Sequence, residues 1–446
     1  MPAIILALST CATFGHAAVT GQLWYGGQGP TGDTASGFTD DILGHVNSDG
    51  SDPALVAYVP GSANCEIVGL DTVSNLYFSY WSDGTLRSGR MTGGQLASIQ
   101  LADLGLDDEI NAFAVDPTHH IVYVGLWGSD PSGADLIEVT YNPTNGQMVS
   151  PYNAATGKIT NAAGVLLSET STTNRFVLAR QMWVQPGGNL IYYVDNDNGD
   201  PNDATLGGEQ LNGVYVVSTT NSNPQPEQLS LTNQFPGDET NGYIIGLAVN
   251  VPQNLIYFAT AGPSQGVDTA SNAIWCMPIT GGAATVMPMP EGVTLEYPNF
   301  YGGCLALDTA AQALYVSDEG QGTIVKLLLS NTGTNFIGGT SNFFTLDADH
   351  LNDGVNGFAS AFTQGLEFVP TVLTNAPAIL NILTQGPNVI LSWPLADYLY
   401  SLQDSPDLFS SDWTDYSGPV SVVGTNIVVT NAINGNPMEF YRLVQQ

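Results

Sequence analysis

Apolar and polar positions repeat five times along the chain in one short pattern. An apolar segment is followed by a turn rich in Asp, Pro, Asn or Gly, and then by a second apolar segment that contains a tyrosine. The copies span residues 67–77, 113–123, 182–192, 247–257 and 305–315. Each copy predicts a β-hairpin. A hairpin of this size cannot bury its own apolar face, so the copies must stack against each other to make a core.

The segments that follow the repeated hairpins predict further strands. Third strands are expected at 84–91, 273–278 and 322–329, and glycine pairs follow the first two. The unequal intervals between copies argue against a solenoid of equal layers and favour a propeller, whose blades tolerate loops of any length. No long stretch has helical periodicity, so we expect an all-β chain.

The two ends of the repeat region each predict half of a blade. Residues 365–369 form a sixth inner strand with no tyrosine strand after it, and residues 22–25 form a second strand with no first strand before it. Residues 54–59 can supply an outer strand. We therefore predict a six-bladed β-propeller closed by strands from both ends, which leaves few exposed sheet edges. Seven blades are the alternative, if residues 29–52 contain further strands.

The sequence of the repeats resembles that of the six-bladed propellers of the YWTD (LDL-receptor class B) and NHL type. The likeness covers about residues 21–369, and its motifs are Tyr80-Trp81-Ser82-Asp83 with Arg87, residues 91–94, and residues 314–318 with Ile324. Gluconolactonase-like enzymes share this general form and hold a catalytic metal with Glu, Asn and Asp along the central channel. The resemblance therefore directs attention to Glu367, which lies in an expected inner strand, although it assigns Glu367 no partners.

The C-terminal part of the chain has a different pattern. Short strands with alternating apolar positions are expected at 388–393, 398–404, 411–416, 419–423, 426–430 and 439–444, which suits a small β-sandwich of the immunoglobulin or fibronectin kind. The sequence of this part is similar to that of a module found at the C-terminus of many secreted proteins of Verrucomicrobia. Its matching motifs are residues 391–394, 400–403, 413–414, 429–433 and 440–443. The resemblance implies a role in attachment or export.

The N-terminus predicts the location of the protein. Residues 3–14 form a short apolar run, and small residues precede Ala18 where a signal peptidase would cleave. We therefore expect a signal peptide at 1–18, a propeller at 19–375, a sandwich at 376–446, and a secreted or cell-surface protein with no membrane span. Cys65, Cys276 and Cys304 remain after cleavage. They form either a bridge between Cys276 and Cys304 or three small buried apolar groups.

The charge balance limits the classes of partner. The chain has 7 basic and 41 acidic residues, which gives a formal net charge of −34. Such a field repels the phosphates of nucleic acids and anionic membrane surfaces, so neither is an expected partner. It attracts divalent cations, although a solvated acidic surface is the simpler interpretation.

Two clusters of aspartates are candidate calcium sites. The first contains Asp195, Asp197, Asp200 and Asp203, and the second contains Asp347, Asp349 and Asp353. Alternating Asp side chains in a tight turn can converge on one cation, with backbone carbonyls in the remaining positions. The first cluster departs from the EF-hand pattern, since its glycine stands one position early and Leu206 replaces the closing Glu. A plain polar loop is the alternative for both.

Strand direction predicts where binding occurs. In an antiparallel blade the loops between second and third strands share one face with the connectors between blades, and the long insertions are of these two kinds. We expect this face to be the recognition surface, with Trp127, Tyr297 or Phe300 exposed on it. Packing between blades is the alternative for each aromatic residue.

Catalytic motifs are few. The chain has no HExxH pair or phosphate loop, and His119 and His120 fall in a hairpin turn on the opposite face. The sequence therefore assigns no catalytic residue and no cofactor except calcium. It predicts a noncatalytic propeller that binds a carbohydrate, peptide or protein partner. The alternative is a lactonase-like or lyase-type enzyme with a metal in the central channel.

Overall fold

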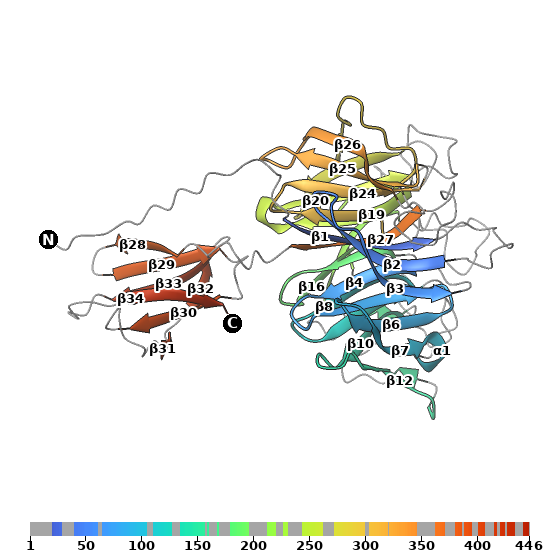
Figure 1. The fold of residues 1–446 in the computed structure, drawn as a ribbon, viewed down its shortest axis with the longest axis horizontal. Helices are drawn as coiled ribbons and strands as arrows, with labels where there is room; N and C mark the ends of the chain where they lie inside the picture. Colours follow the sequence, from blue (N-terminus) through green and yellow to red (C-terminus); the bar gives the residue numbers. More distant parts are fainter. Residues whose placement is uncertain are drawn as a thin grey trace. The chain divides into compact units, whose positions relative to one another are not determined.

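The structure is a computed structural model, shown in Figure 1. It describes residues 20–28, 40–60, 65–104, 110–126, 134–156, 158–159, 167–168, 179–195, 212–219, 226–230, 243–261, 272–298, 303–319, 321–345, 362–370, 380–385, 388–394, 400–405, 414–416, 420–423, 426–432 and 440–445. The expected signal peptide lies outside these residues. The chain forms two compact units, Met1–Pro370 and Thr371–Gln446, and each is described by itself.

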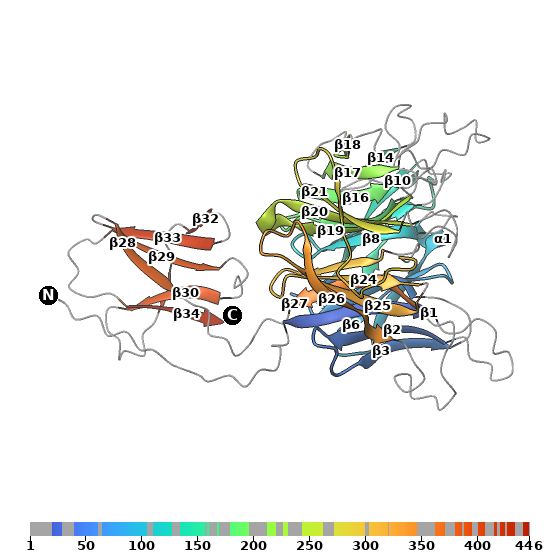
Figure 2. The same cartoon turned by 90° about the horizontal axis from the view of Figure 1, so that it is seen from above.

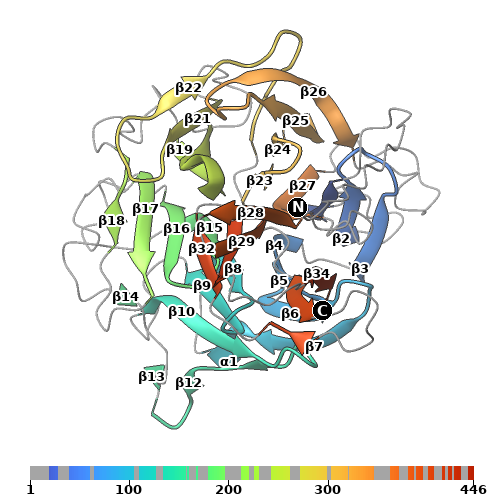
Figure 3. The same cartoon turned by 90° about the vertical axis from the view of Figure 1, so that its left-hand side faces the viewer.

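The described residues of the first unit form six antiparallel sheets, each with a path of four strands. The sheets stand side by side around a ring (Figures 2 and 3). Blade 1 contains β4 (Cys65–Asp71), β5 (Leu76–Trp81), β6 (Thr85–Arg90) and β7 (Gln95–Gln100). Blade 2 contains β8 (Ile110–Asp116), β9 (Ile121–Leu126), β10 (Ala134–Tyr141) and β11 (Met148–Val149). Blade 3 contains β15 (Ala179–Val184), β16 (Leu190–Asp195), β17 (Gly213–Ser218) and β18 (Glu227–Gln228).

The remaining blades complete the ring. Blade 4 contains β19 (Tyr243–Asn250), β20 (Leu255–Ala261), β21 (Ala273–Pro278) and β22 (Thr285–Met287). Blade 5 contains β23 (Leu305–Asp308), β24 (Ala313–Asp318), β25 (Thr323–Leu329) and β26 (Phe336–Thr345). Blade 6 contains β27 (Phe362–Pro370), β1 (Gly21–Gln28), β2 (Asp40–Asn47) and β3 (Ala54–Pro60).

Blade 6 joins the two ends of the propeller. Strand β1 pairs antiparallel with β27, with Leu23 opposite Phe368 and Tyr25 opposite Leu366. The predicted closure is confirmed, and the protein is an all-β, six-bladed propeller. The sequence did not predict β2, because its polar residues Asp40, Asp41 and Asn47 interrupt the apolar pattern. This strand completes blade 6 and supplies no seventh blade.

In four of the five repeats an acidic or amide residue caps the hairpin turn. Asp71, Asp116, Asn250 and Asp308 end their inner strands and are buried. In each case a side-chain oxygen accepts hydrogen bonds from backbone N–H groups of the turn, as Asp308 Oδ1 does from Ala310 at 2.9 Å and Ala311 at 2.8 Å. A buried polar residue that satisfies turn donors holds the hairpin closed.

The tyrosines of the fourth and fifth repeats connect one blade to the next. The hydroxyl of Tyr257 in blade 4 donates to the carbonyl of Gly333 in blade 5 at 2.9 Å. The hydroxyl of Tyr315 in blade 5 donates to the carbonyl of Ser48 in blade 6 at 3.2 Å. Both acceptors lie in the turn between the third and fourth strands of the next blade. The repeated pattern is therefore explained by architecture alone.

Blade 1 departs from the common register. Its tyrosine, Tyr77, follows the capping Asp71 one residue sooner than in the other copies. Successive side chains of a strand point to opposite faces, so this shift turns Tyr77 toward blade 6, where its ring centroid lies 6.4 Å from that of Trp24. Phe78 takes the place that faces blade 2 and packs on Tyr141 at 4.6 Å. The hydroxyl of Tyr141 donates to Asp71 at 2.8 Å.

The outer edge of blade 2 contains an insertion that the sequence did not predict. Short strands β11 and β14 (Leu167–Ser168) both pair with β10, and a small hairpin of β12 (Tyr152–Asn153) and β13 (Lys158–Ile159) lies between them in sequence. The one described α-helix, α1 (Leu101–Leu104), connects blades 1 and 2. In the part of the chain that the structure describes, no helix is long and apolar enough to cross a membrane.

The second unit is a β-sandwich of two sheets (Figure 1). One sheet contains β28 (Asn381–Gln385), β29 (Asn388–Pro394), β33 (Asn426–Ala432) and β32 (Val420–Val423), and the other contains β31 (Thr414–Asp415), β30 (Tyr400–Ser405) and β34 (Phe440–Gln445). Leu391, Trp393 and Val429 of the first sheet pack with Leu402 of the second. Strand β28 was not predicted.

The three described cysteines are buried, and no disulfide joins them. The expected alternative of a bridge between Cys276 and Cys304 is therefore not formed. Burial raises the pKa of the Cys304 thiol, which keeps it protonated and unreactive.

Candidate functional site

The inner strands meet around the axis of the propeller. Each contacts the next in the order β4, β8, β15, β19, β23, β27, and β27 contacts β4. Five of them contain a β-bulge near their first residues. The pairing register shifts at Glu66, Asn111, Arg180, Ile245 and Gly365. Bulges often re-aim side chains next to binding sites, so this end of the axis is the candidate site.

The bulges lie at the end of the axis that the long insertions share. Inner strands begin and second strands end at this face. The connectors between blades and the loops between second and third strands therefore start there as well. In the neighbouring blades 1, 2 and 3 the residue at the bulge is polar: Glu66, Asn111 and Arg180 respectively. Asn111 is buried, and its Nδ2 atom has no hydrogen-bond partner.

A small recess adjoins the bulges. Six of its lining residues are apolar and three are polar: Ile67, Val68, Ala112, Phe113, Met182 and Leu366, with Arg180, Gln181 and Glu367. They come from β4, β8, β15 and β27, so the recess lies beside the axis against blades 6, 1, 2 and 3. The surface that its lining exposes is mostly polar.

Gln181 uses its whole side-chain amide to hold neighbouring blades together. Its Nε2 donates to the carbonyl of Leu305 in blade 5 at 2.7 Å. Its Oε1 accepts from the backbone N–H of Leu247 in blade 4 at 2.9 Å and from that of Leu305 at 3.2 Å. Gly303 makes room for this contact, since a Cβ there would lie 2.7 Å from Gln181 Cδ. Gln181 is therefore a structural bridge between blades 3, 4 and 5.

Glu367 is the one carboxylate among the lining residues of the recess. Burial alone raises the pKa of its carboxyl group to about 7. No neighbouring charge contributes to this shift, although Arg180 lines the same recess. Catalytic carboxylates and metal ligands are usually coupled to other charged groups. The described residues provide no such coupling to Glu367.

The donor set near the axis does not fit the metal of gluconolactonase-like enzymes. Such a site needs several converging oxygen ligands, and the recess offers one carboxylate and an amide that is already bonded to backbone. Among the described residues no group of three or more His, Cys, Asp or Glu side chains could hold a metal ion.

The predicted calcium ligands fall mostly outside the described residues. Asp197, Asp200, Asp203, Asp347, Asp349 and Asp353 all do. Asp195 is described: it ends β16 and is fully buried. Asp318 ends β24 at the corresponding place in blade 5, where its carboxylate accepts from the backbone N–H groups of Glu296 at 2.7 Å and Tyr297 at 2.8 Å. The calcium site stays a prediction.

The predicted recognition aromatics have a mixed outcome. Tyr297 is buried in the core between blades 4 and 5, so for this residue the alternative of ordinary packing is right and surface exposure is wrong. Trp127 and Phe300 lie outside the described residues. His119 and His120 lie in the turn between β8 and β9, as expected, and His119 Nδ1 lies 2.7 Å from Asp116 Oδ2.

The sequence singled out Glu367 but missed Arg180, Gln181 and Asn111. Only the bulges bring these residues to the candidate site, and a bulge leaves no mark in an apolar strand pattern. The chemical signal available in advance was the pair Arg180-Gln181 just before the apolar Met182 and Trp183.

Comparison with known proteins yields structural likeness only. No protein-family model and no curated protein sequence matches the chain. Among solved structures, TolB from Acinetobacter baumannii is similar at 9% identity with a TM-score of 0.46, covering 79% of this chain and 67% of TolB. The periplasmic gluconolactonase PpgL of Pseudomonas aeruginosa is similar at 13% identity with a TM-score of 0.41, covering 92% and 99%.

A functionally unknown protein from Desulfotomaculum acetoxidans DSM 771 is similar at 11% identity with a TM-score of 0.38, covering 76% of this chain and 89% of that one. At such identities a likeness concerns the fold, and fold does not determine function. The strand order of this chain establishes the propeller by itself.

Proposed function

We propose that the protein is a noncatalytic propeller of the YWTD/NHL type that binds a carbohydrate, peptide or protein outside the cytoplasm. The observation that carries the proposal is the axial recess. Its one carboxylate, Glu367, is coupled to no other charge, and the amide of Gln181 is committed to backbone. The recess thus supplies neither a paired acid and base nor a set of metal ligands.

The binding face in this proposal is the one where the bulged ends of the inner strands lie. Loops on a rigid scaffold are common binding sites. The segments that join strands at this face include the acidic stretch 195–203 and residues 346–361. Their charge favours partners that are neutral or basic, and it disfavours anionic polymers. In the same proposal the signal peptide directs export, and the sandwich serves attachment or export.

Arrays of glycans and peptides, probed with the full chain, test the binding function. We expect saturable binding to one class of ligand, and lactone hydrolysis no faster than the buffer blank with or without added divalent metal. The variant Glu367→Gln is the control for catalysis and should leave both results unchanged. Lactone turnover that Glu367→Gln abolishes would overturn the proposal in favour of the enzyme.

Calcium binding is tested separately by thermal unfolding of the full chain. A ligand that binds only the folded form raises the melting temperature. We expect a higher melting temperature in millimolar calcium than in chelator. The triple variant Asp197→Asn, Asp200→Asn, Asp203→Asn should lose this difference, whereas the matched triple variant Asp347→Asn, Asp349→Asn, Asp353→Asn reports on the second cluster. Equal melting temperatures for the unmodified chain in both buffers would exclude the calcium site.

A further inference from the structure

The tyrosine that faces the next blade has a cross-strand neighbour on the third strand of its own blade. This neighbour is Val216 in blade 3, Cys276 in blade 4 and Lys326 in blade 5. In blade 2 it is Glu138, which lies opposite Tyr123. Side chains directly opposite in an antiparallel pair share one face of the sheet. Glu138 therefore faces blade 3.

Glu138 is buried in this junction without a full set of partners. Its side chain is 7% exposed, and its Oε2 atom has no hydrogen-bond partner among the residues that the structure describes. A buried carboxylate in this condition is costly when it is charged and much less costly when it is protonated. The charged and titratable groups that act on it are Asp116 and His119 of the β8–β9 turn, and Tyr123 of β9.

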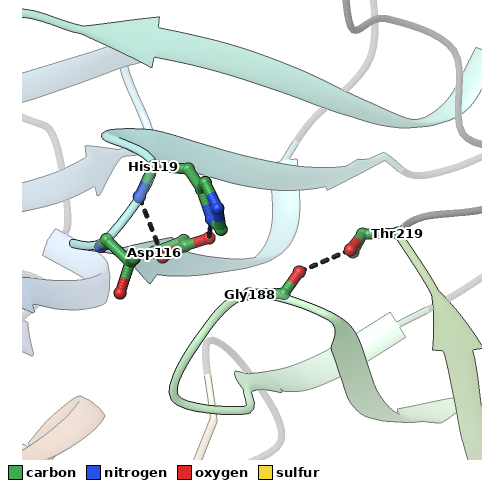
Figure 4. Close-up of polar contacts among 5 residues, drawn as sticks. Asp116, His119, Gly188 and Thr219 are labelled. Atoms are coloured by element: carbon green, nitrogen blue, oxygen red, sulfur yellow. Dashed lines mark hydrogen bonds and ion pairs between the residues drawn. The ribbon is translucent and has the colours of Figure 1, made fainter. Parts of the chain in front are cut away.

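The other carboxylate of the junction is already satisfied. Asp116 Oδ1 accepts from the backbone N–H groups of Thr118 at 2.9 Å and His119 at 3.2 Å, and Oδ2 lies 2.7 Å from His119 Nδ1. Figure 4 shows His119 folded back over Asp116. The hydrogen bonds of this turn therefore stabilise one negative charge at Asp116 and supply no partner to Glu138.

Blade 3 packs tightly against this turn. A Cβ on Gly188 would lie 2.0 Å from Asp116 Oδ2 and 2.5 Å from His119 Nδ1. The carbonyl of Gly188 accepts from the hydroxyl of Thr219, so the blade 3 side is itself fixed (Figure 4). Blade 3 thus approaches the two side chains of the turn that act on Glu138.

We propose that the contact between blades 2 and 3 is proton-dependent: it is held closed while Glu138 is protonated and weakens as Glu138 gives up its proton. Burial, and then the charge of Asp116, raise the pKa of Glu138 to about 7, while a charged His119 lowers it. The contact therefore weakens as the pH rises toward neutrality.

The sign of the effect follows from the two pKa values. Below the ordinary pKa of 4.5 the carboxyl is protonated whether the junction is closed or open. Between 4.5 and about 7 only the closed form keeps the proton, so each pH unit favours opening by about tenfold. Above about 7 both forms are ionised and no further change occurs. The contact is thus strongest in mild acid.

Amide hydrogen exchange on the full chain tests the proposal. Opening is measured for amides of 185–195 and 212–219 at pH 5 and pH 7.5, after correction for intrinsic exchange. The junction between blades 4 and 5, around Tyr257 and Gly333, is the internal control, because its equivalent third-strand residue is Cys276. We expect opening between blades 2 and 3 to rise up to about 100-fold relative to the control. Any effect of Glu367 on global unfolding acts on both junctions and cancels in this ratio.

Two variants identify the titrating group. Glu138→Gln keeps the shape and removes the charge, so opening should become independent of pH. His119→Asn keeps Glu138, so most of the pH dependence should remain. Equal pH responses at the two junctions would overturn the proposal. So would a response that persists in Glu138→Gln and disappears in His119→Asn, since His119 would then be the switch.

Discussion

Two junctions between blades of the propeller contain a titratable residue at the same position, but the two residues differ in their polar partners. Lys326 in blade 5 faces blade 6, and Glu138 in blade 2 faces blade 3. Lys326 donates to the carbonyl of Ser48, and its Nζ lies 5.3 Å from the centroid of Tyr315 and 5.0 Å from that of Phe343. Glu138 has an orphaned oxygen. Burying a charge is tolerated where partners surround it and becomes pH-dependent where they do not.

The junction between blades 5 and 6, which contains Lys326, is also the place where the ring closes. Thr20, just before β1, donates to Asp308 of blade 5, and its N–H donates to Ser48 Oγ at 2.8 Å. The ring of Tyr315 stacks on Phe368 of β27 with centroids 5.8 Å apart. Desolvation lowers the pKa of Lys326, while Asp308 and Asp49 raise it. The closing junction thus combines polar, aromatic and ionic contacts.

Reversing the charge at Lys326 should have the largest effect. Lys326→Glu places a carboxylate beside Asp308 and opposite a carbonyl oxygen. An uncompensated buried charge should lower the free energy of unfolding by about 3–5 kcal/mol. Urea denaturation measures this loss in the free energy of unfolding. The control Lys326→Met keeps the apolar stem and removes the desolvation cost, so its change should stay within about 1 kcal/mol. Equal losses for both variants would contradict the role of the charge.

Adding a side chain at Gly188, in the contact between blades 2 and 3, should have the next largest effect. Gly188 has a φ of +72°, and a Cβ there would overlap Asp116 Oδ2. Gly188→Ala should therefore lower the free energy of unfolding by about 2–3 kcal/mol. Gly187→Ala is the matched control, because its φ is +97° but nothing lies within 4 Å of an added Cβ. It should cost about 1 kcal/mol. Similar melting temperatures for the two variants would show that this contact is not tight.

Removing one tyrosine hydroxyl should have the smallest effect. Tyr257→Phe loses the hydrogen bond to Gly333, and the free energy of unfolding should fall by about 1 kcal/mol. Tyr192 occupies the same place in blade 3 and makes no hydroxyl hydrogen bond to the described residues. The variant Tyr192→Phe should therefore change the free energy of unfolding by less than about 0.5 kcal/mol. Guanidinium titration separates these values. A larger loss for Tyr192→Phe would disprove the connecting role of the repeated tyrosine.

The fold was predictable because its strands follow an apolar pattern of period two. The hairpins and the pairing of β1 with β27 were found in this way. Strand β2 was missed because polar residues break its pattern, and β28 was missed because Ile382 and Leu383 are exposed on an edge. The facing of Tyr77 was not predicted, because the pattern of the copies does not show that the capping Asp71, rather than the tyrosine, sets the face.

The candidate site was less predictable than the fold. Glu367 was found because it is an acidic residue in an apolar strand. The bridge from Gln181 to Leu305 joins residues far apart in sequence, and no local pattern indicates it. Glu138 appears in sequence as one polar residue in the strand ADLIEVTY, where a solvent-facing position is the normal interpretation. Its burial depends on blade 3.

The pairing of β1 with β27 has a consequence for biogenesis. A ribosome makes these two strands at opposite ends of the first unit, so β1 emerges long before its partner exists. Its edge must stay unpaired, and shielded from wrong partners, until nearly all other blades have been synthesised. Because such distant contacts form slowly, the last step of maturation should be the joining of these two strands.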